Sequence, residues 1–174
     1  MMDIESLFLE ICKYIEEKSE YFDIFIKCDT RYEGWFQTEI LKYILYNLSE
    51  IKIKSVGKNL QNWGKADIVF EYQNKEYIIE LKAGVIGKNR GYNLYLITNA
   101  GAGKDFSRMG KEIHQNAWAI VCLTPCKGSD NKEFISKVTQ AQETYNVKKW
   151  KEFKFYTPEE KPVTITLWGK KLAK

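Results

Sequence analysis

Two acidic residues and a lysine interrupt neighbouring apolar segments, at Asp67, Glu80 and Lys82. The segments 66–72 and 76–82 are rich in Ile, Val, Phe and Tyr, and the polar residues between them predict a β-hairpin. A charge inside a half-buried strand is costly unless it has a partner. Two carboxylates beside an ammonium are a set that can hold a divalent cation and support acid–base chemistry.

The spacing of the predicted hairpin places the two acids opposite each other. A loop at Gln73-Asn74 pairs Asp67 with Glu80, and facing residues on antiparallel strands have Cβ atoms roughly 4.5–5.5 Å apart. Lys82 shares their face because side chains alternate along a strand. Facing like charges are destabilising, and a cation between them would reverse that effect. A slip of one residue would separate the acids, and a salt-bridged strand on a solvated face is the alternative interpretation.

Composition indicates an ordinary globular chain. Its 174 residues, without a linker or an internal repeat, predict a single domain over 1–174, and 44% hydrophobic residues can supply a core. The net charge of +4 is compatible with a polyanionic partner. No apolar run approaches the roughly 20 residues of a membrane span, and the N-terminus lacks a signal-peptide pattern. Scattered cysteines with no nearby histidine predict buried free thiols in a reducing cytoplasm.

Hydrophobic periodicity predicts helices and strands along the whole chain. The predicted helices span residues 4–18, 32–47, 104–115 and 132–145. The predicted strands outside the hairpin span residues 51–56, 117–123, 153–156 and 163–168. Loops are predicted at 57–64 and 84–91, and 92–98 is either a strand or the start of a helix. This order favours an α/β sheet with helices on both sides.

The predicted helix at 32–47 carries two candidate acids. Its apolar stripe, extended backwards, reaches Glu33 at the rim of the buried face, whereas Glu39 falls among polar residues on the solvated side. Glu33 is either an acid favoured by the helix dipole, with Arg31 nearby, or a third acid at the metal site. The choice between Glu33 and Glu39 as the helix acid stays open at this point.

The acids and the lysine follow one another along the chain as Glu33, Asp67, Glu80 and Lys82. With a helix before a β-hairpin, this order resembles the PD-(D/E)XK nuclease superfamily over about residues 30–125, although Ala66 stands in place of its proline. The resemblance implies a restriction-endonuclease-like α/β core, with a central mixed β-sheet flanked by helices on both sides.

The resemblance also implies a function. It implies a Mg²⁺-dependent endonuclease, with Mn²⁺ as a substitute, that hydrolyses phosphodiester bonds of nucleic acid, with DNA as the expected substrate. Asp67, Glu80 and the Leu81 backbone carbonyl would hold the metal, and Glu33 would act through water or on a second ion. Lys82 would orient or deprotonate the attacking water, or offset charge in the transition state. A homodimer would allow both strands to be cut.

Basic residues that flank the predicted site in the sequence are candidate phosphate contacts: Lys88, Arg90, Lys104 and Arg108. Two other functions stay open. The chain could be a non-catalytic nucleic-acid-binding or protein-interaction module on the same fold, or a structure-specific junction resolvase. The intact set of Asp67, Glu80 and Lys82 favours hydrolysis over a binding module.

Overall fold

The structure is a computed structural model that describes residues 3–61, 63–87, 90–98, 101–110 and 116–170. Within these residues, six strands form one mixed sheet in the order β1-β2-β3-β4-β6-β5. The strands are β1 Lys52–Leu60, β2 Gly64–Tyr72, β3 Lys75–Val85, β4 Ala117–Thr124, β5 Val147–Tyr156 and β6 Pro162–Lys170. The helices are α1 Ile4–Glu16, α2 Glu20–Lys27, α3 Glu33–Asn47, α4 Tyr92–Leu96, α5 Gly103–Gly110, the short 3₁₀ turn η1 Gly128–Asp130 and α6 Lys132–Tyr145.

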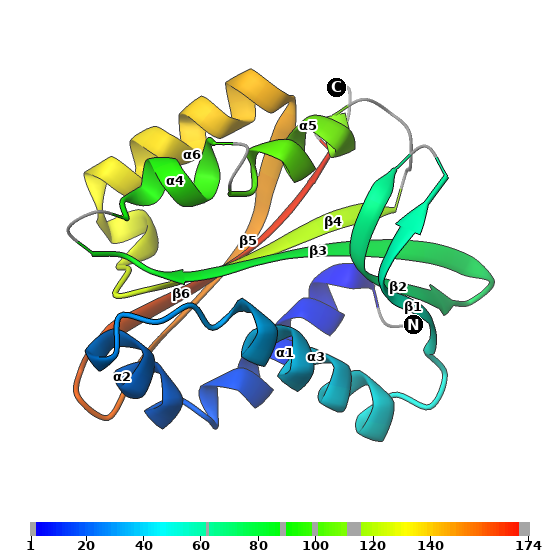
Figure 1. Cartoon of the computed structure of the whole chain (residues 1–174), viewed down its shortest axis with the longest axis horizontal. Coiled ribbons are helices and arrows are strands. Elements are labelled where there is room, and N and C mark those ends of the chain that lie inside the picture. The colour runs from blue at the N-terminus through cyan, green and yellow to red at the C-terminus, as the bar shows by residue number, and fades with distance from the viewer. Residues whose placement is uncertain (1–2, 62, 88–89, 99–100, 111–115, 171–174) are drawn as a thin grey trace.

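Helices cover both faces of the sheet (Figure 1). Helices α1, α2 and α3 pack on one face, where apolar side chains such as Phe36 and Leu81 form the first core. Helices α4, α5 and α6 pack on the other, where Phe106 and Trp168 belong to a second core. Strands β3 and β4 are parallel, so the chain crosses between them through α4 and α5. The predicted α/β class with a mixed sheet is confirmed.

The β2–β3 hairpin has the predicted loop and the predicted register. Gln73 and Asn74 both have positive φ, 51° and 58°, which is the backbone of a two-residue turn that matches the twist of the strands. Pairing then runs from Tyr72 opposite Lys75 to Ile68 opposite Ile79. The paired ladder ends one position before Asp67 would face Glu80, so the expected direct pairing of the two acids is not part of it.

Both predicted loops, 57–64 and 84–91, begin too early, because a glycine that the prediction places in each loop lies inside a strand. Gly57 lies inside β1, where its φ of +62° and a bulge between Ile53 and Ser55 bend the strand without ending it. Gly84 lies inside β3, where a Cβ would stand only 2.2 Å from the Tyr95 ring. Glycine there allows the ring to pack directly on the backbone.

Other bounds differ from the predictions at short or half-exposed segments. Helix α2, which is only eight residues long and buries only Phe22 and Asp23, is not among the helices predicted from the sequence. The undecided segment 92–98 forms helix α4. Strand β5 begins earlier than predicted, at Val147, and its mostly exposed or half-buried pattern explains why the apolar signal was weak. The end of the predicted helix 104–115 lies outside the described residues.

Two findings bear on the predicted environment. No helix in the described ranges is long and apolar enough to cross a membrane. The cysteines are free thiols, of which Cys12, Cys122 and Cys126 are buried and Cys28 is exposed. The prediction of buried free thiols is therefore confirmed for Cys12, Cys122 and Cys126 and is wrong for Cys28, while the compartment stays a prediction.

Tyr32 joins α3 to the two parallel strands. Its buried hydroxyl lies 2.9 Å from the Cys122 carbonyl oxygen of β4 and 3.2 Å from the Gly84 carbonyl oxygen of β3. Its ring stacks on Phe25 with centroids 4.8 Å apart. Because Glu33 follows directly in the chain, this anchor fixes where the first acid of α3 lies relative to β3.

We predict that Tyr32→Phe lowers the free energy of unfolding by about 1 kcal/mol, because the variant loses a buried hydroxyl that two carbonyl groups share. Urea unfolding followed by circular dichroism measures this. Tyr46→Phe is the matched control, since Tyr46 is 82% exposed and should change stability by less than about 0.5 kcal/mol. Equal stability of the two variants would contradict the anchoring role of Tyr32.

Candidate functional site

One edge of β3 loses its neighbouring strand where the candidate site begins. Strand β2 pairs with β3 only as far as Ile79, whereas β4 stays paired on the other side up to Val85. Backbone N–H groups on the free edge therefore need other acceptors. The Asp67 Oδ2 atom accepts a hydrogen bond from the Leu81 N–H at 2.7 Å. The end of the ladder thus fixes a carboxylate against β3.

Glu80 and Lys82 project from β3 toward the face covered by α5, as alternation predicts. Glu80 is only 2% exposed, and its Oε1 accepts hydrogen bonds from Trp63 Nε1 at 2.6 Å and from Arg108 Nη1 at 3.1 Å. The Lys82 Nζ donates to the Leu81 carbonyl oxygen at 2.8 Å. The lysine therefore covers the carbonyl group that was expected to contact a metal.

Helix α5 adds an acid that the sequence reasoning missed. Asp105 is 4% exposed, and its Oδ1 accepts a hydrogen bond from Arg108 Nη2 at 3.0 Å. Its Oδ2 lies 3.7 Å from Lys82 Nζ and makes no hydrogen bond to any described residue. The available signal was the spacing of Asp105 and Arg108, which puts an acid and a base on one side of a helix that follows the Glu80-Leu81-Lys82 strand.

Helix α3 supplies Glu33 and not Glu39. The Glu33 Oε1 lies 3.6 Å from Lys82 Nζ. Glu39, expected on the solvated side, is instead buried at 7% exposure, because α1 packs over it and its carboxylate binds the Tyr14 hydroxyl and the Lys42 ammonium. The structure therefore places Glu33, the first residue of α3, at the candidate site.

Burial and crowding of carboxylates dominate the electrostatics of the site. Burial raises the pKa of Glu33 and of Asp105, although the Lys82 ammonium opposes both shifts. Burial, with the Asp105 carboxylate next, raises the pKa of Glu80 to about 8, and the contacts with Trp63 and Arg108 do not cancel this. For Lys82, burial lowers the pKa, but the surrounding carboxylates outweigh it and the net shift is upward.

The structure brings Glu33, Asp67, Glu80 and Lys82 together, as expected. The predicted phosphate contacts lie in different surroundings. Arg108 lies inside the site, between Glu80 and Asp105. Arg90 pairs with Asp29, with its Nη2 atom 3.3 Å from Oδ2, and Lys104 is exposed on α5. Lys88 lies outside the described residues.

The described part of the chain contains no group of three or more His, Cys, Asp or Glu side chains already arranged to hold a metal ion. The reason lies in the contacts above. Arg108 and Trp63 engage Glu80, the Leu81 N–H engages Asp67, and the Lys82 ammonium stands between Glu33 and Asp105. Hydrogen-bond donors and cations of the protein itself therefore contact several of the oxygen atoms that a metal ion would bind.

Comparison of this chain with protein-family models, with curated proteins and with solved structures finds no match. The resemblance to the PD-(D/E)XK superfamily therefore rests on the residues and their arrangement alone.

The raised pKa of Glu80 predicts how stability depends on pH without divalent cations. Between its ordinary value of 4.5 and about 8, the native state retains a proton that the unfolded state has lost. Rising pH therefore destabilises the fold, by at most about 1.4 kcal/mol per pH unit. We expect the unfolding free energy in EDTA to fall between about pH 5.5 and about pH 7.5, with a shallower slope for Glu80→Gln.

Chemical unfolding of wild type, Glu80→Gln and Glu76→Gln over this pH range tests the shift. Glu76 lies on the same strand and is exposed, so its variant should keep the wild-type slope. Parallel curves for wild type and Glu80→Gln would show that Glu80 does not titrate in this range.

Proposed function

We propose that this chain is a Mg²⁺-dependent nuclease that hydrolyses phosphodiester bonds of nucleic acid, with DNA as the expected substrate. One observation carries the proposal. Among the described residues, carboxylates from four separate elements gather around one lysine: Glu33 of α3, Asp67 of β2, Glu80 of β3 and Asp105 of α5. Such a cluster is costly to bury unless its charge is offset, so its assembly from distant segments calls for a functional explanation.

The donor set fits a hard divalent cation. Carboxylate and carbonyl oxygens are the ligands that Mg²⁺ and Mn²⁺ prefer. With Lys82 and Arg108 as the cations in contact with them, the clustered carboxylates keep a formal excess of negative charge when all are ionised. The buried Asp105 Oδ2, which no described residue bonds, adds an acceptor that a cation would satisfy.

The residues that would hold the ion are Asp67, Glu80 and the Leu81 carbonyl, with Asp105 and Glu33 next to them. When bound, Mg²⁺ supplies Lewis-acid stabilisation of charge on the phosphoryl group and makes a water molecule more acidic. Binding of the ion would require the Lys82 ammonium to leave the Leu81 carbonyl oxygen and Arg108 to release the Glu80 carboxylate. Lys82 and Arg108 would then be available to contact substrate oxygens.

Lys82 is best suited to offsetting charge. The carboxylates that raise its pKa keep it as an ammonium at neutral pH, which favours donation to a phosphoryl oxygen or to the attacking water over deprotonation of that water. Glu33, whose side chain is 43% exposed, is the more accessible carboxylate and can orient a water molecule. The mixed sheet with helices on both faces supports the restriction-endonuclease-like core that the resemblance implies.

Cleavage of supercoiled plasmid with Mg²⁺ tests the proposal. We expect wild type to nick or linearise DNA, Asp67→Ala to be inactive, and Lys82→Met to be slower by about a hundredfold or more, because it loses a charge beside the reacting phosphate. Glu33→Gln should also lose activity, while Glu39→Gln, which changes a buried acid of the same helix, should keep it. Absence of cleavage of plasmid, linear DNA and RNA by wild type with Mg²⁺ or Mn²⁺ would favour a binding module.

Cation binding can be measured independently of cleavage. We expect Mg²⁺ at about a hundred times its dissociation constant to stabilise wild type by about 2.7 kcal/mol. Asp67→Asn should remove this stabilisation, because it takes away a charged ligand, and Glu39→Gln should retain it. Thermal unfolding across a Mg²⁺ titration gives the result, and an equal rise for Asp67→Asn would place the ion elsewhere.

A further inference from the structure

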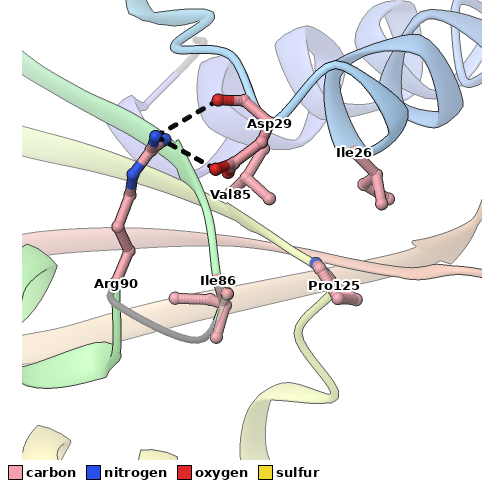
Figure 2. Close-up of a pocket in the computed structure, with 7 residues that line it drawn as sticks. Ile26, Asp29, Val85, Ile86, Arg90 and Pro125 are labelled. Carbon is pink, nitrogen blue, oxygen red and sulfur yellow. Dashed lines mark hydrogen bonds and ion pairs between the residues drawn. The ribbon is translucent and has the colours of Figure 1, made fainter.

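A second feature lies beside the candidate site. A cavity of about 460 Å³ opens at the carboxyl ends of the parallel strands β3 and β4 (Figure 2). It lies between α2 and the segment that follows β3 and is lined by Ile26, Asp29, Val85, Ile86, Gly87, Arg90 and Pro125. Its volume falls in the range of pockets that hold small organic groups, roughly 300–1,000 Å³.

The cavity combines apolar walls with an ion pair between Arg90 and Asp29. Ile26, Val85, Ile86 and Pro125 supply the walls. Figure 2 shows Arg90 reaching toward Asp29, and its Nη2 donates to the Asp29 carbonyl oxygen at 3.2 Å and to Oδ2 at 3.3 Å.

The other terminal nitrogen of Arg90, Nη1, is buried and makes no hydrogen bond within the described ranges of the chain. A buried donor without an acceptor costs free energy, so an oxygen atom of a ligand in the cavity would stabilise it. The guanidinium also lies beside the Tyr95 hydroxyl, where it partly opposes the upward shift that burial gives the tyrosine pKa.

Two segments connect this cavity to the candidate site. Val85 lies on the same strand as Lys82, roughly 10 Å further along the free edge. Asp29 belongs to the short segment that leads into Glu33, and this segment also carries the exposed Arg31. The Val85 side chain faces the α1–α3 side of the sheet, opposite to Lys82. A nucleic-acid strand with a phosphate at Lys82 would therefore cross the free edge of β3 to bring a neighbouring nucleotide to the cavity.

We propose that this cavity receives one unpaired nucleotide of the substrate strand, next to the phosphodiester that is cleaved. The proposal rests on the nuclease function proposed above. The base packs against the apolar walls, and an oxygen atom of the nucleotide accepts a hydrogen bond from Arg90 Nη1. A base that stays stacked and paired in a duplex cannot enter a concave pocket. The expected substrates therefore carry a single-stranded segment beside the cleavage point, such as an end, a flap or a loop.

Oligonucleotide binding tests this in the Lys82→Met background with Mg²⁺, so that the probe is bound and not cut. The probes are a duplex with a single-stranded flap that carries 2-aminopurine, and a blunt duplex of the same sequence. We expect 2-aminopurine emission to rise on binding of the flap probe, because the base leaves its stack for an apolar pocket. Ile86→Trp, which fills the cavity, and Arg90→Gln should each weaken flap binding about tenfold or more and abolish the rise in emission.

The same variants should bind the blunt duplex within about twofold of the background protein. Lys13→Gln, which changes an exposed lysine on α1, should leave the emission rise and the preference for the flap probe intact. Thermal unfolding checks that each variant is folded. If Ile86→Trp does not fold, the flap-binding test rests on Arg90→Gln. Equal affinity for both probes, or an emission rise that survives Arg90→Gln, would overturn the proposal.

Cleavage of the same probes with Lys82 intact separates this inference from the nuclease function. Cleavage without a preference for the flap refutes the pocket alone. Pocket-dependent binding by a protein that never cleaves refutes the nuclease and leaves a single-strand-binding module. Loss of both cleavage and flap-selective binding refutes both proposals.

Discussion

The candidate site depends on the point where β3 loses its neighbour. Pairing with β2 stops at Ile79, while β4 holds the other side of β3 up to Val85. The free edge exposes backbone groups that β-strands normally satisfy with another strand. Here a side chain takes that role, because Asp67 binds the Leu81 N–H. The same opening lets α3 and α5, on opposite faces of the sheet, both bring acids to Lys82.

The carboxylates of the cluster repel one another, and the two cations among them, Lys82 and Arg108, offset only part of this repulsion. Burial and like charge raise the pKa of Glu80 and of Asp105, and Arg108 binds both carboxylates at once. Such a cluster contributes little to stability, because apolar residues of similar volume often stabilise a fold more than buried ion pairs do. The divalent cation that we propose would supply positive charge where Lys82 and Arg108 contact the carboxylates in this structure.

Much of this architecture could be predicted from local sequence patterns. The remaining features depend on packing between segments that are distant in the sequence. The hairpin register followed from Gln73-Asn74 and the apolar spacing, because a two-residue turn fixes which residues face each other. Glu33 could be placed at a rim but not chosen over Glu39, because the packing of α1 over Glu39 is not visible in the periodicity of α3. The spacing of Asp105 and Arg108 was visible in the sequence, but it does not reveal that α5 packs where Asp105 reaches Lys82 and Arg108 reaches Glu80.

The most direct test of the central claim is a crystal structure of the protein with Mn²⁺, measured for anomalous scattering. We predict one strong peak in contact with the Asp67 and Glu80 carboxylates and the Leu81 carbonyl. Arg108 should then have released Glu80, and the Lys82 ammonium should have left that carbonyl oxygen. No peak at this place at saturating Mn²⁺, with the Arg108–Glu80 ion pair intact, would show that these residues do not bind a divalent cation.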